Sequence, residues 1–483
     1  MFTARSQLWT ITAQYLDRYR QHVPDRTAPG GTGPAPGFPL PVTGAQRRFL
    51  LARLLTSHGR PDLVPLFFVL PRGAVDPVRL GSAAAYVAAR HPVLRTRAAV
   101  LGGVPVLRTT EPEEPSAYVT QVRGTGRGGT DSRDDALRAA LADWQPGPPL
   151  RLFLAAATDD SALRGDGDGS DSDSDDGREV LALVLDHAVC DEQSLGVVIG
   201  DLAEAYTFDL GAHDLPGSHA ADALAVYRDA VHRQLDAEHR ASTGSALSYW
   251  AERLAGAPLP GPADAAGPRE DSGVLRATLP SGSGSGTGTG SGSGSADGHG
   301  RLFPALLGAC DRAARALHGY GPRDPAPLLG YPWGGRPPGA EGLVGCFLNT
   351  VPYRVPGPDA DPDAAFATWC ADLDHAGTPF DEIVRAARSA GLPWNGGFHA
   401  LLTYEDRARR PALRLGRAVG SETHVDGRPL QAPLTVSVSH GSAHGAEPVV
   451  RMAWERGAFP RRAGHRAEVT AFAALLDALP AGA

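Results

Sequence analysis

The 483-residue sequence contains no lysine, so all 46 of its lysine-plus-arginine residues are arginine. A chain without lysine has no Walker A lysine to hold phosphates and no lysine to form a Schiff base with pyridoxal phosphate. The sequence also has no GxSxG motif, so the nucleophile elbow of a serine hydrolase is not supported. These absences exclude several large classes of enzyme.

Cysteine is scarce and dispersed. The four cysteines, Cys190, Cys310, Cys346 and Cys370, include no CxxC pair. We therefore expect neither a disulfide framework nor a zinc site, and we interpret the thiols as reduced and mostly buried.

Long apolar runs and dense basic runs are also missing. No stretch approaches the length of a membrane span, and residues 1–23 lack the apolar core and cleavage site of a secretory signal. The net charge of -8, with no basic run to offset it, argues against a nucleic-acid partner. The sequence therefore predicts a cytoplasmic protein that binds neither membrane nor nucleic acid.

Composition separates folded segments from low-complexity ones. Residues 1–38 are expected to form an N-terminal extension, with a short amphipathic helix over 7–21 and a Gly/Pro linker over 28–37. The acidic, serine-rich residues 165–177 and the Gly/Ser/Thr residues 281–300 are expected to be disordered surface loops. Folding proper is expected to begin near Phe38.

The spacing of apolar residues predicts both helices and strands. Helices are expected over 46–57, 76–91, 302–317 and 467–479, and strands over 66–70, 343–355, 434–439 and 449–454. This mixture predicts an α/β or α+β protein in two lobes.

The most informative segment is residues 180–206. It begins with a continuous apolar run, as a buried strand requires, and continues through a polar loop into a pattern of helical spacing that Asp191 or Ser194 could cap. His187, between strand and helix, is well placed to act as a general base, and the N–H groups of the helix start could stabilise an oxyanion. A purely structural histidine fits the same pattern, so position alone leaves both interpretations open.

Residues 186–192, Asp-His-Ala-Val-Cys-Asp-Glu, resemble the HHxxxDG motif of nonribosomal-peptide condensation domains, with His187 as the second histidine and Asp191 as the aspartate. Four further segments resemble motifs of that family in the same order. They are PLPVTGAQ at 39–46, HPVLRT at 91–96, GLVGCFLNT at 342–350 with Arg336 upstream, and TPFDE at 378–382. Five motifs in sequence order are hard to produce by chance.

The resemblance implies an α/β fold of two chloramphenicol acetyltransferase-like lobes, here 39–210 and 211–483, in a V-shaped pseudo-dimer with a central tunnel. It implies no bound cofactor. The acyl donor would arrive as a thioester on the phosphopantetheine arm of an acyl or peptidyl carrier protein, and the acceptor would be an amine or an alcohol. No carrier-protein or adenylation segment is evident, so these partners are expected on separate polypeptides.

The resemblance also implies residue roles. His187 would orient the acceptor and accept its proton. Asp191 would be structural, paired with Arg95 of the HPVLRT segment. Asn349 and Arg336 would lie at the tunnel near the crossover between lobes, although Asn349 could instead be an amide that only satisfies backbone groups. The clustered arginines could meet an acidic carrier protein or form a solvated loop. They are Arg407, Arg409, Arg410, Arg414 and Arg417.

Two positions depart from the family motif. Asp186 replaces the first histidine and, with Asp191 and Ser194, formally satisfies the DxxxxDxxS pattern of heterocyclization domains. It could equally fill the structural role of that histidine. Glu192 replaces the glycine, and could narrow the tunnel, bind a cationic substrate, raise the pKa of His187 or mark a chain that has lost catalysis.

Three functions follow from these residues. His187 favours a stand-alone enzyme of natural-product biosynthesis that forms an amide or ester by acyl transfer, and this is our first prediction. Asp186 favours heterocyclization with loss of water. Glu192 favours a catalytically inactive module that recruits a carrier protein or a partner enzyme.

Overall fold

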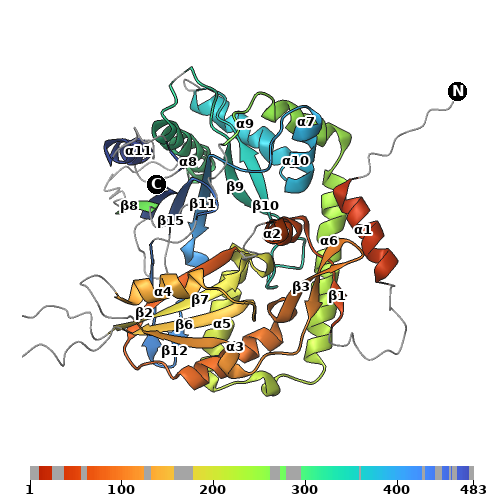
Figure 1. The fold of residues 1–483 in the computed structure, drawn as a ribbon, viewed down its shortest axis with the longest axis vertical. Helices are drawn as coiled ribbons and strands as arrows, with labels where there is room; N and C mark the ends of the chain where they lie inside the picture. The colour runs from red at the N-terminus through yellow and green to blue at the C-terminus, as the bar shows by residue number, and fades with distance from the viewer. Residues whose placement is uncertain are drawn as a thin grey trace, which may run out of the picture.

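The computed structural model describes residues 10–23, 37–55, 62–123, 132–156, 178–260, 272–278, 295–321, 323–357, 361–426, 430–440, 449–455, 458–459 and 465–477. The described chain forms two lobes, each built on a mixed β-sheet with helices packed against it (Figure 1). This arrangement confirms the predicted two-lobed α/β fold. The expected loop over 165–177 and all but the last residue of the expected linker over 28–37 lie outside the described residues.

The first lobe is centred on strand β7 (Arg178–Asp186), which is buried from Glu179 to its end. A strand between two neighbours and covered on both faces carries apolar side chains almost without interruption, so the run at 180–185 predicted it correctly. The five-stranded sheet has the order β14 (Ser421–Thr423), β2 (Leu63–Pro71), β7, β6 (Leu150–Ala156) and β5 (Val119–Arg123). A three-stranded sheet of β1 (Pro39–Leu40), β4 (Val104–Thr109) and β3 (Thr96–Leu101) stands beside it.

The helices of the first lobe are α1 (Ile11–His22), α2 (Gly44–Leu55), α3 (Pro77–Arg90), α4 (Ser132–Ala142), α5 (Glu192–Phe208) and α6 (His219–Ala241). Figure 1 shows α2 between the two lobes and the long α6 along one side of the molecule.

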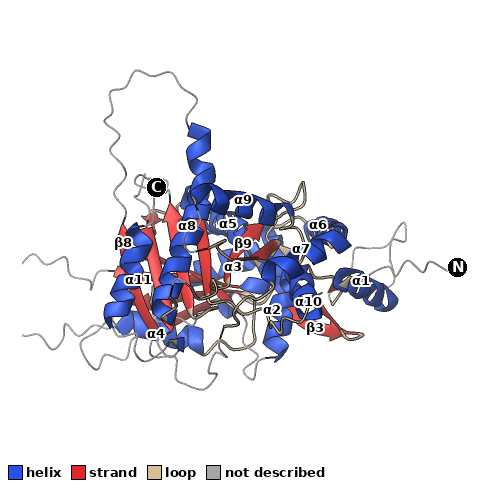
Figure 2. Cartoon of the chain, turned by 90° about the horizontal axis from the view of Figure 1, so that it is seen from above, coloured by secondary structure: helices blue, strands red, loops and turns tan. Residues whose placement is uncertain are grey.

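The second lobe has a six-stranded sheet in the order β10 (Leu348–Tyr353), β9 (Leu329–Gly334), β11 (Ala400–Asp406), β15 (Leu434–His440), β16 (Val449–Glu455) and β8 (Ser272–Thr278). Its helices are α7 (Gly244–Leu254), α8 (Ser295–His318), α9 (Pro362–Asp374), α10 (Phe380–Ser389) and α11 (His465–Asp477). Helices α8 and α11 lie side by side along the strands (Figure 2).

Three expected boundaries need correction. Helix α1 is no loose extension, because Tyr15 and Leu16 are buried in the core of the first lobe. Helix α6 lies beyond the expected boundary at 210, yet it buries Tyr227 and Leu235 in that same core. Helix α8 begins at Ser295, inside the segment 281–300 that we expected to be a loop; residues 281–294 lie outside the described residues.

After strand β11 of the second lobe, the chain crosses back to the sheet of the first lobe. Strand β14 follows β11 in the chain but pairs antiparallel with β2, with Glu422 opposite Phe68. The hairpin of β12 (Arg414–Leu415) and β13 (Ala418–Val419) precedes it, and Leu413 and Leu415 are buried in the core of the first lobe. The crossover therefore ties the second half of the sequence to the first sheet. No helix of the described residues is long and apolar enough to span a membrane.

Candidate active site

His187 stands where β7 ends and a single turn of 3-10 helix, η5 (His187–Val189), begins. Its Nδ1 lies 3.1 Å from the carbonyl oxygen of Cys190. Because a carbonyl oxygen can only accept, Nδ1 carries the proton and Nε2 carries the lone pair in the neutral ring. The half-buried ring stacks on Phe49 of α2, with centroids 4.3 Å apart, and Nε2 has no hydrogen-bond partner among the described residues. The imidazole is thus fixed on one edge and presents a basic nitrogen on the other.

Gln46 of α2 holds the histidine turn in place. Its Nε2 donates to the carbonyl oxygen of Ala188 at 2.8 Å and to the hydroxyl of Tyr227 at 3.2 Å. Its Oε1 accepts from the backbone N–H of Thr43 at 3.0 Å. Our sequence prediction of the site did not include Gln46, and its only signal was membership of the 39–46 motif.

Asp186 stabilises the histidine turn and does not face the Nε2 edge of His187. One carboxylate oxygen accepts from the backbone N–H of Ala188 at 3.0 Å, and the other forms an ion pair with Arg53 of α2. The residue is only 8% exposed. Both oxygens are therefore engaged, which is the structural role we considered for the residue that replaces the motif's first histidine.

Asp191 pairs with Arg336, not with Arg95 as we expected from the family resemblance. The Asp191–Arg336 ion pair is buried, with the two side chains 6% and 4% exposed. Arg95 instead donates to the carbonyl oxygen of Thr110 at 2.8 Å, and burial without a close carboxylate lowers its pKa. The prediction failed because several arginines satisfy the same sequence argument, and only the packing of the lobes selects one.

The 342–350 segment packs directly on the start of α5. The backbone N–H of Phe347 donates to Asp191 at 3.1 Å, and that of Gly345 donates to the hydroxyl of Ser194 at 3.1 Å. Ser194 also completes the cap of α5, because its own N–H donates to Asp191 at 3.0 Å. Ser194 is fully buried, so the structure gives it a joining role between the two halves of the sequence.

Glu192, next to Asp191, points its carboxylate at Arg410. The Nε and Nη2 atoms of Arg410 lie 2.9 Å and 2.6 Å from Oε1 of Glu192. Arg410 also pairs with Glu405 at 3.1 Å and with Glu422 at 3.0 Å. We name these four residues the Arg410 cluster; it joins α5 and β14 to β11 of the second lobe. Glu192 and His187 share no hydrogen bond or ion pair among the described residues.

The Arg410 cluster has more negative than positive charge. Burial, assisted by the neighbouring Glu405 and Glu422, raises the pKa of Glu192 to about 7, although Arg410 opposes the shift. Burial of an acid favours its neutral form, and like charges act in the same direction. Glu192 therefore changes protonation near neutral pH, which the sequence alone did not indicate.

The five clustered arginines do not form one free cationic surface. Arg410 is 6% exposed and bound as above, Arg407 pairs with Glu422 at 2.9 Å, and Arg409 pairs with Asp406 at 3.0 Å. Arg414 and Arg417 alone of the five are exposed with no ion pair among the described residues. Arg407 and Arg410 fit neither alternative that we considered for the cluster, a docking patch or a solvated loop, because their side chains are paired with carboxylates at the crossover.

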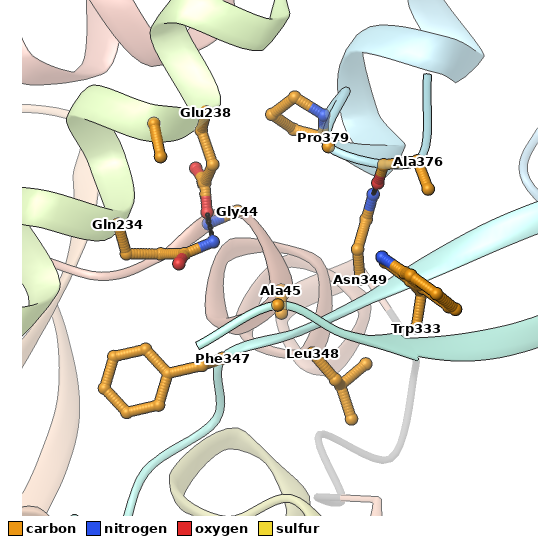
Figure 3. Close-up of a pocket in the computed structure, with 13 residues that line it drawn as sticks. Gly44, Ala45, Gln234, Glu238, Trp333, Phe347, Leu348, Asn349, Ala376 and Pro379 are labelled. Carbon is orange, nitrogen blue, oxygen red and sulfur yellow. Dashed lines mark hydrogen bonds between the residues drawn. The ribbon is translucent and has the colours of Figure 1, made fainter. Parts of the chain in front are cut away.

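A pocket of about 120 Å³ lies where α2, α6, β9, β10 and the turn before α10 meet (Figure 3). Gly44, Gln234, Glu238, Trp333 and Asn349 are among its lining residues. The pocket brings elements of both lobes to the N-terminus of α2, whose Gly44 N–H donates to Glu238 at 3.0 Å. His187 does not line this pocket.

Asn349 lines the inter-lobe pocket, and its amide is fully used by the backbone. Its Nδ2 donates to the carbonyl oxygens of Ala376 at 2.8 Å and Thr378 at 2.6 Å. Its Oδ1 accepts from the N–H of Phe380 at 3.1 Å. Asn349 therefore orients the turn that leads into α10, which agrees with the structural alternative we considered for it.

The described residues include no group of three His, Cys, Asp or Glu side chains that could hold a metal ion. The thiols of Cys190 and Cys346 are buried and unbridged, and burial raises the pKa of each well above its usual value.

Comparisons with known proteins find similarity in sequence and in fold. No model of a known protein family matches the chain. The AMB antimetabolite synthetase AmbE of Pseudomonas aeruginosa is 30% identical over 395 residues, which cover 78% of this chain and 17% of that synthetase. The first condensation domain of the calcium-dependent antibiotic synthetase superposes with a TM-score of 0.63 at 15% identity, covering 92% of this chain and 97% of that one.

The chain belongs to the condensation-domain family of nonribosomal peptide synthetases. Another solved structure with this fold is the X-domain from teicoplanin biosynthesis, with a TM-score of 0.60, 19% identity and coverage of 94% of this chain and 97% of that one. The same X-domain has also been solved in complex with OxyB. The condensation-family chain spans less than one fifth of the length of AmbE, at 17%.

Proposed function

We propose that this condensation-family chain transfers an acyl group from a carrier-protein thioester to an amine or alcohol acceptor, forming an amide or an ester. The observation that supports the proposal is the His187 ring, whose Nδ1–H is anchored to Cys190 while Nε2 has no partner among the described residues. A neutral imidazole held in one tautomer, with its basic nitrogen available, is the arrangement that general-base catalysis needs.

In the proposed reaction the acceptor nitrogen or oxygen attacks the thioester carbonyl while Nε2 of His187 takes its proton. The tetrahedral intermediate then collapses, the C–S bond breaks, and the thiolate receives the proton from the imidazolium. The products are the amide or ester and the free phosphopantetheine thiol. Since a thioester is already activated, holding the two substrates together supplies a large part of the rate.

The test is to incubate the protein with an acyl-loaded carrier protein and candidate acceptors, and to follow the carrier by mass spectrometry. We expect His187→Ala to slow acceptor-dependent unloading by roughly 10²-fold to 10⁴-fold, the usual contribution of a general base, with residual rate from proximity. His213→Ala is the matched control, because the His213 side chain is 86% exposed and belongs to the segment between α5 and α6. Unloading by His187→Ala at the unaltered rate would refute the assignment.

A second candidate is a non-catalytic module that recruits a partner enzyme. Two observations favour it: Glu192 replaces the motif's glycine and is tied across the lobes to Arg410, and the fold is shared with an X-domain that forms a complex with OxyB. In the same assay such a module would bind loaded carrier protein without unloading it. If Glu192 is what prevents turnover, Glu192→Gly would restore unloading; the heterocycle alternative would show as a product lighter by one water.

A further inference from the structure

Arg48 of α2 lies between the His187 ring and the inter-lobe pocket. Its guanidinium carbon is 5.8 Å from the ring centre of Phe49, which in turn is 4.3 Å from the imidazole centre, so the guanidinium lies within about 10 Å of the imidazole. Its other neighbours are Phe380, 4.4 Å away, and the hydroxyl of Thr350. Those two residues directly follow Pro379 and Asn349, which line the pocket.

Arg48 differs from the other arginines around this site because it has no ion pair among the described residues. Its neighbour Arg47 pairs with Asp381 at 3.0 Å and with Glu238 at 3.7 Å. The remaining pairs are Arg53 with Asp186, Arg336 with Asp191, and Arg385 with Glu382. These carboxylates are therefore bound to other guanidinium groups, and Asp62, which also acts on Arg48 electrostatically, forms no ion pair with it among the described residues.

The surroundings of Arg48 disfavour an uncompensated charge. Burial lowers the pKa of Arg48 to about 10, and the more distant Asp62 offsets only part of that effect. Two aromatic faces and one neutral hydroxyl attract a guanidinium but do not neutralise it. The Arg48 guanidinium is partly exposed but has no counter-ion in the described part of the chain, so an anionic ligand that reaches it would be bound favourably.

We propose that Arg48 binds a carboxylate carried by one of the substrates, beside His187. The inference rests on the proposed acyl transfer for the identity of the ligand as a substrate. A guanidinium presents a planar fork that matches a carboxylate through two parallel hydrogen bonds. The phosphate of a phosphopantetheine arm is a poorer match, because the full length of the arm separates it from the thioester that must reach His187.

The first test measures binding without turnover. N-acetylglycine and N-acetylglycinamide have the same shape, but only the first carries a carboxylate. We expect ligand-observed NMR to show N-acetylglycine binding to the unaltered protein roughly 10-fold to 100-fold more tightly than the amide, the effect of a charge-assisted pair. Arg48→Gln should abolish the difference, and Arg385→Gln, which removes a nearby but paired arginine, should keep it.

The second test separates the two possible sources of the carboxylate. Acceptors are compared as free amino acid and amino acid amide, and donors as succinyl-loaded and succinamoyl-loaded carrier protein. We expect Arg48→Gln to raise KM for one carboxylate-bearing substrate far more than KM for its amide, whereas His187→Ala lowers kcat for both. The substrate whose KM changes is the one that Arg48 binds.

Stability distinguishes a binding residue from a structural one. We expect Arg48→Met to leave the melting temperature unchanged or to raise it, because it removes an unneutralised charge, whereas Arg47→Met should lower it. The proposal is overturned if the unaltered protein does not distinguish the two probes, or if Arg48→Gln binds N-acetylglycine normally. If the probes behave as expected and no carrier is unloaded, the anion site stands and the proposed function fails.

Discussion

Asp191 and Glu192 are adjacent carboxylates that both bind an arginine from the second half of the sequence, yet their surroundings are opposite. Asp191 meets Arg336 in a buried pair and also accepts from the N–H groups of Ser194 and Phe347. Glu192 shares Arg410 with two other glutamates, and its side chain is 43% exposed. One carboxylate is fully matched, and the other is one of several that compete for a single cation.

The difference shows that neighbouring positions of one motif can serve separate purposes. A buried, fully hydrogen-bonded pair is costly to break and fixes one arrangement of the lobes. A partly exposed cluster with excess negative charge costs little to change and responds to pH. The motif's aspartate therefore belongs to a fully matched buried pair, while the glutamate at the family's glycine position belongs to a cluster of three carboxylates around one arginine.

The largest effect is expected at Asp191. Asp191→Ala leaves the buried Arg336 without a carboxylate partner, and should lower the free energy of unfolding by about 3–5 kcal/mol, measured by urea titration. A double-mutant cycle with Arg336→Ala should show strong coupling, while a cycle with Arg95→Ala should be additive. Coupling to Arg95 instead would contradict the pairing described above.

An intermediate effect is expected at Asp186. Asp186→Ala removes the carboxylate that pairs with Arg53 and accepts from the Ala188 N–H, and should cost about 1–3 kcal/mol in the same titration. Asp229→Ala is the control, because the side chain of Asp229 is 64% exposed and pairs with Arg233 on the surface of α6, so its loss should stay within about 1 kcal/mol. Equal losses at both positions would show that Asp186 does not support the turn.

The smallest effect is expected at Glu192, and its signature is pH dependence. The raised pKa of Glu192, about 7, means that the folded chain binds a proton which the unfolded chain releases at lower pH. Its contribution to stability is therefore present in mild acid and is lost as the pH rises through about 7. Glu192→Gln should change stability by no more than about 1 kcal/mol at neutral pH.

Urea titrations from about pH 5 to about pH 8 measure that slope. We expect the stability of the unaltered protein to fall more steeply with pH than that of Glu192→Gln. Glu341→Gln is the control, because Glu341 is exposed and its pKa is lowered by backbone N–H groups, so it contributes no loss of stability in this range. Parallel curves for the unaltered protein and Glu192→Gln would mean that Glu192 does not gain a proton on folding in this pH range, which would contradict the prediction.

Much of the local structure could be predicted because its signals are local. The apolar run before Asp186 predicted β7, and the apolar spacing after Asp191 predicted α5 with its cap. Burial on both faces of a strand and on one face of a helix leaves such patterns within a few residues. The exclusion of α1 and α6 from the first lobe was wrong, because periodicity gives a helix an apolar face but does not name the core that it meets.

The sequence by itself determined the order of strand, histidine turn and helix, and the identity of the motif residues. Because the chain has no lysine, it also determined that arginine, and never lysine, pairs with the carboxylates. The tertiary structure alone decided that Arg336 meets Asp191, that Arg410 gathers three glutamates, and that Arg48 has no carboxylate among the described residues. Secondary structure follows from neighbours a few positions apart, whereas an ion pair depends on which of many equivalent charges the packed lobes bring within a few ångströms.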